Sequence, residues 1–161
     1  MSAPFSRVDA VYAAARWGWF MATFLLLGAA SYAPFLFRAR TALHRTDPDV
    51  ARELARRAAV IGLVASLTLL GLALLRLYLQ ALTLVDPGEP VTGEFLRAVL
   101  SSSWGKGWLR QVAMVVLATL AFAAAFSGAG ARLGWLVASA ASGGLGVTAG
   151  MTGHANTARA G

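Results

Sequence analysis

Apolar residues dominate four long segments of this chain, and charged or polar residues bound each segment. The segments cover residues 17–37, 58–85, 108–131 and 133–154. A helix needs about 20 apolar residues to cross the hydrocarbon core of a bilayer, so each segment is long enough. Lipid offers no hydrogen-bond partners to the open edge of a strand, which makes a helix the required structure. We therefore predict a bundle of four transmembrane helices.

The composition supports a membrane protein. Hydrophobic residues make up 58% of the 161-residue chain, and charged residues make up only 13%. A soluble domain carries about 25% charged residues. We predict an all-α, polytopic membrane protein in which residues 1–161 form one transmembrane domain. The first apolar segment is longer than the core of a signal peptide and three more follow, so we expect it to remain in the mature chain.

The distribution of basic residues predicts the orientation of the chain. Six arginines lie between the first and second apolar segments: Arg38, Arg40, Arg45, Arg52, Arg56 and Arg57. The connection 86–103 has Arg97 as its only base, although Lys106 and Arg110 follow close behind it. Basic loops stay in the cytoplasm, so we expect the amino terminus outside and the arginine-rich loop inside. With Asp47, Asp49 and Glu53 counted, this loop contributes +3 to the net charge of +7, and no nucleic-acid partner is expected.

Tryptophans cluster near two of the predicted membrane boundaries. Trp17 and Trp19 begin the first segment, and Trp104 and Trp108 lie one helical turn apart at the third. Indole rings prefer the interface between lipid and water. We expect these four residues to act as interface anchors on the outer side.

Two further helical features lie outside the apolar segments. Asp47 and Pro48 form a helix start signal before residues 49–57, which predicts a helical extension into the cytoplasm. Residues 91–100 predict a short helix that rests on the membrane surface or caps the bundle. One side of this helix is apolar and the other is charged. The apolar side holds Phe95, Leu96, Val99 and Leu100, and the charged side holds Glu94 and Arg97.

Several kinds of chemistry are excluded by what the chain lacks. The sequence has no cysteine, which excludes disulfides, thiolate metal sites and iron–sulfur clusters. It shows no Ser/His/acid set, no pair of carboxylates within an apolar segment and no nucleotide-binding motif. We therefore predict that the protein is not an enzyme.

The fourth segment combines small residues with a histidine. Ser142, Gly146, Gly150 and His154 are spaced by four, so they follow one stripe of a helix. The three small residues allow another helix to approach closely. The stripe indicates either a narrow metal or proton site that ends at His154, or simple helix packing beside a solvated histidine.

The methionines add soft ligands at a similar depth. Met21, Met114 and Met151 each lie about one turn inside the predicted outer face. Thioether sulfur suits Cu(I), and imidazole also binds copper, so these residues and His154 form a candidate copper site. The alternative is that each methionine simply fills apolar space.

Arg76 is unusual because it lies inside the second apolar segment. A charge at that depth is costly and marks a candidate functional residue. Gln80 lies one turn further on the same face, so the two residues form a possible polar path. Snorkelling of Arg76 to the outer surface is the other interpretation. No acidic residue lies within the predicted spans to pair with Arg76.

Two short motifs resemble a known family. Residues 104–110 read Trp-Gly-Lys-Gly-Trp-Leu-Arg, and residues 152–155 read Thr-Gly-His-Ala. Together they resemble the copper resistance protein D (CopD) family, whose members are bacterial inner-membrane proteins linked to copper uptake or export. The resemblance covers the whole chain, but only the front half of a typical member. It implies copper transport or resistance, a metal-linked histidine at His154 and a periplasmic copper carrier as partner.

Other functions stay open beside copper transport. The chain could be a non-catalytic membrane subunit or assembly partner that packs through its glycine-rich fourth helix, either in a homo-oligomer or against missing carboxy-terminal helices. A haem is not expected within one chain, because His44 and His154 fall on opposite membrane faces under the predicted topology. A dimer that pairs His154 with its counterpart is the one haem arrangement left open.

Overall fold

The described part of the chain folds into five α-helices. The structure is a computed structural model that describes residues 7–85, 89–128 and 131–151, with the side chains of 7–9, 33–46 and 149–151 left aside. The helices are α1 (Arg7–Thr46), α2 (Pro48–Leu84), α3 (Gly93–Ser101), α4 (Ser103–Ser127) and α5 (Ala131–Met151). The described residues contain no strand, so the all-α prediction is confirmed for this part of the chain.

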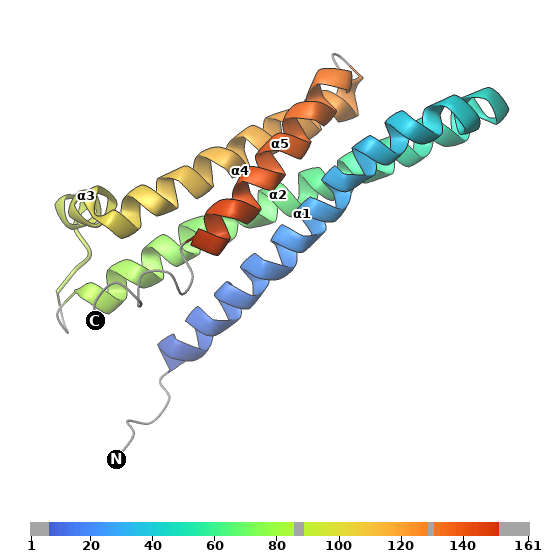
Figure 1. Ribbon diagram of the computed structural model, residues 1–161. Helices are drawn as coiled ribbons and strands as arrows, with labels where there is room; N and C mark the ends of the chain where they lie inside the picture. The colour runs from blue at the N-terminus through green and yellow to red at the C-terminus, as the bar shows by residue number, and fades with distance from the viewer. Residues whose placement is uncertain (1–6, 86–88, 129–130, 152–161) are drawn as a thin grey trace.

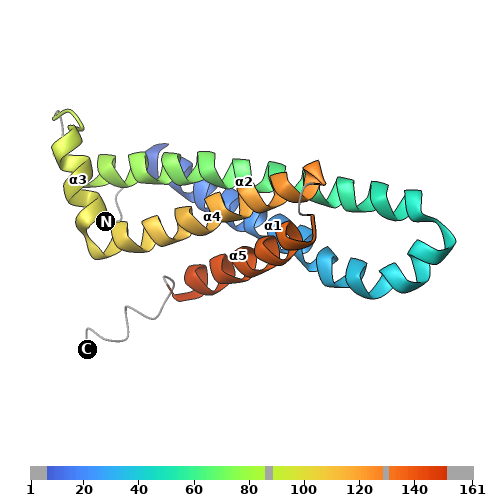
Figure 2. The ribbon, with the colours of Figure 1, turned by 90° about the horizontal axis from the view of Figure 1, so that it is seen from above.

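The four long helices form two antiparallel hairpins that pack together. α1 pairs with α2, and α4 pairs with α5; between the hairpins, α2 contacts α4 and α1 contacts α5. The α1–α2 hairpin extends well beyond the turn between α4 and α5 (Figures 1 and 2). We call this the hairpin end of the bundle. α3 crosses the opposite end at the start of α4, and we call that the α3 end.

Within the described residues, three helices are long and apolar enough to cross a membrane. These are Ala10–Tyr32 within α1, Pro48–Leu84 and Ser103–Ser127. α5 is not one of these three spans. The fourth span and the orientation of the amino terminus therefore stay predictions.

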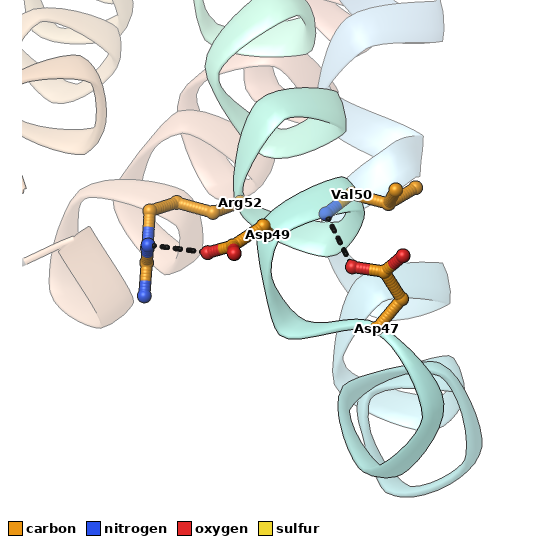
Figure 3. A network of polar contacts seen from close by, with 4 residues as sticks. All are labelled: Asp47, Asp49, Val50 and Arg52. Carbon is orange, nitrogen blue, oxygen red and sulfur yellow. Dashed lines mark hydrogen bonds and ion pairs between the residues drawn. The ribbon is translucent and has the colours of Figure 1, made fainter.

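The arginine-rich segment between the first two spans is helical almost throughout. α1 continues to Thr46 and α2 begins at Pro48, so the helices are longer than the apolar segments alone predict. The Asp47 carboxylate accepts a hydrogen bond from the Val50 backbone N–H at 3.2 Å, which caps α2 (Figure 3). Such a cap stabilises a helix by about 1 kcal/mol. The predicted helical extension is confirmed.

Ion pairs on the exposed surface support the same first turns of α2. Arg52 donates to Asp49 at 3.0 Å, and Arg57 donates to Glu53 at 2.7 Å. Both pairs join residues three or four apart, so each adds a few tenths of a kcal/mol to the helix. Figure 3 shows the first of these pairs beside the Asp47 cap.

The short helix α3 begins with its own cap and packs across α4. The Thr92 hydroxyl accepts a hydrogen bond from the Phe95 backbone N–H at 3.3 Å. Val99 is buried, whereas Glu94 and Arg97 are exposed, as the pattern of residues 91–100 predicts. The predicted short helix is confirmed, and it caps one end of the bundle.

A tight apolar layer lies in the half of the bundle nearer the hairpin end. We define the apolar layer as Gly62, Phe122 and Trp135. Phe122 is fully buried, and its ring meets Trp135 edge to face with centroids 5.7 Å apart. A Cβ atom at Gly62 would overlap the Phe122 ring, so only glycine lets α2 and α4 approach this closely. Shape therefore fixes the helix pair at this level.

The outside of the bundle is apolar as well. Large side chains on all four long helices face outward, among them Phe24 (66% exposed), Leu74 (64%), Leu120 (64%) and Leu133 (67%). A soluble monomer rarely exposes so continuous an apolar surface. The surface suits lipid, in agreement with a membrane protein.

Candidate functional site

The predicted copper ligands on the last helix fall at the edge of the described structure. His154 lies outside the described residues. Met151 ends α5, and its side chain is likewise outside the described part. Of the predicted copper ligands, only Met21 and Met114 have side chains that can be compared with the copper hypothesis.

Met21 and Met114 face different surroundings. Met21 is 49% exposed on the outside of α1. Met114 is half-buried on α4, and its sulfur lies 3.3 Å from the Cβ position of Gly144 on α5. Met114 thus faces α5, the helix that ends at Met151, whereas Met21 points away from the core of the bundle. Depth alone predicts one layer for these methionines, but it does not predict which way each side chain points.

The best-defined polar cluster of the described bundle surrounds Arg76. Its guanidinium carbon lies 4.8 Å from the centre of the Trp19 ring, a distance typical of a cation–π contact. Its Nη1 atom donates a long hydrogen bond to Gln111 Oε1 at 3.5 Å. The Trp108 indole N–H donates to the Ala73 carbonyl at 3.0 Å, one turn before Arg76 on α2. We define the arginine layer as Trp19, Arg76, Trp108 and Gln111.

The arginine layer differs from the polar path predicted by sequence. Gln80 is half-buried, and the described contacts of Arg76 lead to Gln111 on another helix instead. Gln111 is only 4% exposed, and spacing along α2 could not predict it as a partner of Arg76. The residue type of Gln111 is the one sequence feature that could have indicated this role. A polar amide near the start of an otherwise apolar segment needs a hydrogen-bond partner inside the bundle.

Two of the four predicted interface anchors are interior residues. Trp19 is 3% exposed and Trp108 is 8% exposed, so both pack between helices instead of facing the lipid. Their indole groups contact Arg76 and the Ala73 carbonyl, which explains why they turn inward. Trp17 is 67% exposed and Trp104 is half-buried, so these two keep access to the membrane interface.

The small residues of α5 meet neighbouring helices at several points. The Cβ position of Gly146 lies 3.8 Å from Leu27 Cδ1, so α1 approaches α5 there. Ser142 is fully buried, and its hydroxyl has no hydrogen-bond partner within the described part of the chain. The surroundings of Gly150 lie outside that part. Ser142 and Gly146 therefore face the interior of the bundle, as the packing interpretation expects.

The Trp-Gly-Lys-Gly-Trp motif forms the first turns of α4, where α3 turns back into the bundle. Ser102 caps this helix by accepting from the Gly105 backbone N–H at 3.1 Å. Gly105 is buried, and a Cβ atom there would overlap the backbone of Val99 and Leu100. The motif therefore places Trp108 in the interior while α3 folds tightly against α4.

The described residues place a positive charge and a soft thioether inside the bundle. Arg76 holds the charge beside Trp19, and the Met114 sulfur lies against α5 at Gly144. Among the residues that the structure describes, no three His, Asp or Glu side chains gather into a metal-binding group.

Comparison with known families gives one clear result. Residues 7–161 match the family described as copper resistance protein D-like, N-terminal domain. No curated protein and no solved structure matches the chain. The match extends over all five helices and confirms the resemblance carried by the two motifs. The chain therefore belongs to the copper resistance protein D-like family, and residues 7–161 correspond to the N-terminal domain of that family.

Proposed function

We propose that this protein moves copper across the bacterial inner membrane and thereby contributes to copper resistance. The observation that carries the proposal is the family match over residues 7–161. The apolar surface and the three helices able to cross a membrane support a transmembrane role. The proposed role is one of binding and passage, without catalysis.

The proposed topology has four spans with the amino terminus outside. α5 contains 21 residues and rises about 30 Å, which equals the thickness of the hydrocarbon core. It pairs with α4 along the bundle, so the same lipid would surround both. The arginines near the hairpin end favour that end as the cytoplasmic one, because basic segments stay inside. The α3 end then faces outward.

The proposed copper site lies between α4 and α5. Its donors are Met114, Met151 and His154, which supply two thioethers and one imidazole for Cu(I). Met114 supports this choice because its sulfur lies against α5 at Gly144. Met21 faces away from the core of the bundle, so its thioether would join only a site shared with another chain or helix. A periplasmic copper carrier is the proposed partner of this outward-facing site.

Cu(I) binding to the purified chain tests the proposal, with a chromogenic chelator as competitor. We expect His154→Ala to lose binding and His44→Ala, the matched control at the other histidine, to keep it. Met114→Leu should weaken binding, whereas Met21→Leu should leave it unchanged. Equal binding by the parent and His154→Ala, or binding by neither, would contradict the copper site.

A second candidate function is favoured by one open face of α5. Leu136 and Val147 are 57% and 64% exposed, and a Cβ atom at Gly143 between them would meet nothing within 4 Å. Small residues on an open helix face suit the approach of another helix. This face supports the role of a membrane subunit or assembly partner, and retention of a partner chain on purification without Cu(I) binding would favour it.

A further inference from the structure

Arg76 has more hydrogen-bond donors than the described bundle satisfies. A guanidinium carries five N–H donors, and the described contacts of Arg76 are one long hydrogen bond to Gln111 and the Trp19 ring. The ion pairs among the described residues join Arg52 to Asp49 and Arg57 to Glu53 near the hairpin end. A charged group in an apolar region needs acceptors, because lipid chains provide none. The remaining N–H groups of Arg76 therefore need an anionic hydrogen-bond acceptor from outside the described bundle.

A second arginine increases that need. Arg16 on α1 is exposed and precedes Trp19 by one helical turn, and the Trp19 ring contacts the Arg76 guanidinium, so both positive charges lie in one region of the bundle. Tyr12, Arg16 and Trp19 share one face of α1, because they are spaced by four and three residues. This face turns a tyrosine and an arginine toward the same region as Arg76. Repulsion between two cations is strong where the dielectric constant is low, and a shared anion relieves it.

The position along the helix indicates which anion is available. Arg76 lies eight residues before Leu84, where α2 ends, and this separation corresponds to about 12 Å along the axis. Long arginine side chains reach from such a depth toward the headgroup region. Arg16 lies above the exposed Phe20 ring at 6.0 Å, so the surface beside it is apolar and suits acyl chains. Guanidinium groups also match the oxygen geometry of phosphate particularly well.

We propose that Arg16 and Arg76 together bind the phosphate of a phospholipid headgroup at the α3 end, between α1 and α2. Gln111 and Trp19 hold the Arg76 guanidinium in place, and its remaining N–H groups donate to the phosphate oxygens. Arg16 supplies the second charge from the lipid-exposed side. The site shares no residue with the proposed copper ligands and does not depend on copper binding. Basic pockets between transmembrane helices are known to hold headgroups in this manner.

Native mass spectrometry of the full chain released from detergent tests this site. The probes are phosphatidylglycerol, diacylglycerol with the same acyl chains and inorganic phosphate. We expect the parent to retain phosphatidylglycerol but not diacylglycerol. Arg76→Gln and Arg16→Gln should each weaken retention about tenfold or more, because each removes a charge-assisted contact. Arg97→Gln, an exposed arginine on α3 with the same charge change, should bind as the parent does.

The outcomes separate the possible sources of the phosphate. Failure of inorganic phosphate to displace the lipid supports a headgroup, whereas displacement overturns the lipid assignment in favour of a free phosphate. Equal retention of phosphatidylglycerol by the parent and both variants overturns the site altogether, as does equal retention of diacylglycerol. If Arg76→Gln fails to fold, Arg16→Gln decides the question, because its side chain is exposed.

Discussion

The apolar layer and the arginine layer join the same two helices, α2 and α4, in different ways. In the apolar layer, the fully buried Phe122 ring lies against Gly62, where a Cβ atom would not fit. In the arginine layer, a long 3.5 Å hydrogen bond joins Arg76 to Gln111. The Trp108 indole adds a 3.0 Å bond to the Ala73 carbonyl. One layer is held by shape and the other by directed polar contacts.

This difference predicts different responses to mutation in the two layers. A layer held by shape fixes the spacing of the helices through close packing. A layer that buries a partly satisfied arginine accepts a cost in stability, which is typical of functional positions in membranes. We therefore expect the apolar layer to respond to changes of volume, and the arginine layer to respond to changes of donors and charge.

The largest expected effect comes from adding one methyl group to the apolar layer. Gly62→Ala would push a Cβ atom into the Phe122 ring, so α2 and α4 must separate or the ring must turn. Overpacking of this kind lowers stability by about 1–3 kcal/mol. The measurement is loss of helical circular dichroism during unfolding in mixed micelles with increasing sodium dodecyl sulfate.

Gly71 offers a matched control on the same helix. A Cβ atom there meets nothing within 4 Å, so Gly71→Ala should gain helix propensity and raise stability by up to about 1 kcal/mol. Phe122→Leu in the Gly62→Ala background should recover part of the loss, because a smaller side chain makes room. Equal stability of the two glycine variants would show that shape does not hold the apolar layer.

The second largest loss of stability is expected when Trp108 of the arginine layer is changed. Trp108→Phe keeps an aromatic ring but removes the N–H that donates to the Ala73 carbonyl. Hydrogen bonds between membrane helices contribute about 0.6 kcal/mol on average and up to about 1.7. With the smaller ring also leaving space, we expect a loss of about 1 kcal/mol in the same micelle assay.

Trp17→Phe is the control for that variant. Trp17 is 67% exposed, so its replacement should leave the unfolding midpoint unchanged. A similar loss at both positions would assign the effect of Trp108 to the general preference of indole for the interface. The contacts of Trp108 within the arginine layer would then add nothing to the stability of the bundle.

The sequence predicts where most of the helices of this fold lie, but it predicts less well which side chains face the core. Apolar length predicts the spans, and the Asp47 cap with its nearby ion pairs explains why α2 begins well before the apolar segment. The pattern of residues 91–100 likewise predicts α3. The extension of α1 to Thr46 is not predicted by the sequence. The arginines after residue 37 interrupt the apolar pattern, so the pattern indicates a loop there, although α2 packs beside this part of α1 in the structure.

The candidate site was harder to predict because it depends on which way side chains turn. Trp19 and Trp108 occur where interface anchors are expected, yet Arg76 and the Ala73 carbonyl draw them inward. Gln111 is identified as a partner of Arg76 only when α2 and α4 are placed side by side. The family, in contrast, was predictable from two short motifs, since close packing at Gly105 constrains the residues of the first one.

The smallest expected effects concern two serines on α5 and sharpen the distinction between shape and polar contacts. The Ser139 hydroxyl lies 2.9 Å from the Trp135 carbonyl of its own helix and 3.2 Å from the Ala30 carbonyl of α1, so its single proton is shared between two acceptors. The buried Ser142 hydroxyl has no partner in the described part of the chain. Ser139→Ala should therefore cost up to about 0.6 kcal/mol, the average for a full bond between membrane helices. Ser142→Ala should be neutral or slightly stabilising, because it removes a buried hydroxyl whose hydrogen-bonding groups are unsatisfied. Both variants exchange the same atoms one helical turn apart, so a micelle unfolding assay compares them directly. A larger loss for Ser142→Ala than for Ser139→Ala would mean that the hydroxyl of Ser142 has a hydrogen-bond partner within the membrane, and would contradict the expected difference between the two serines.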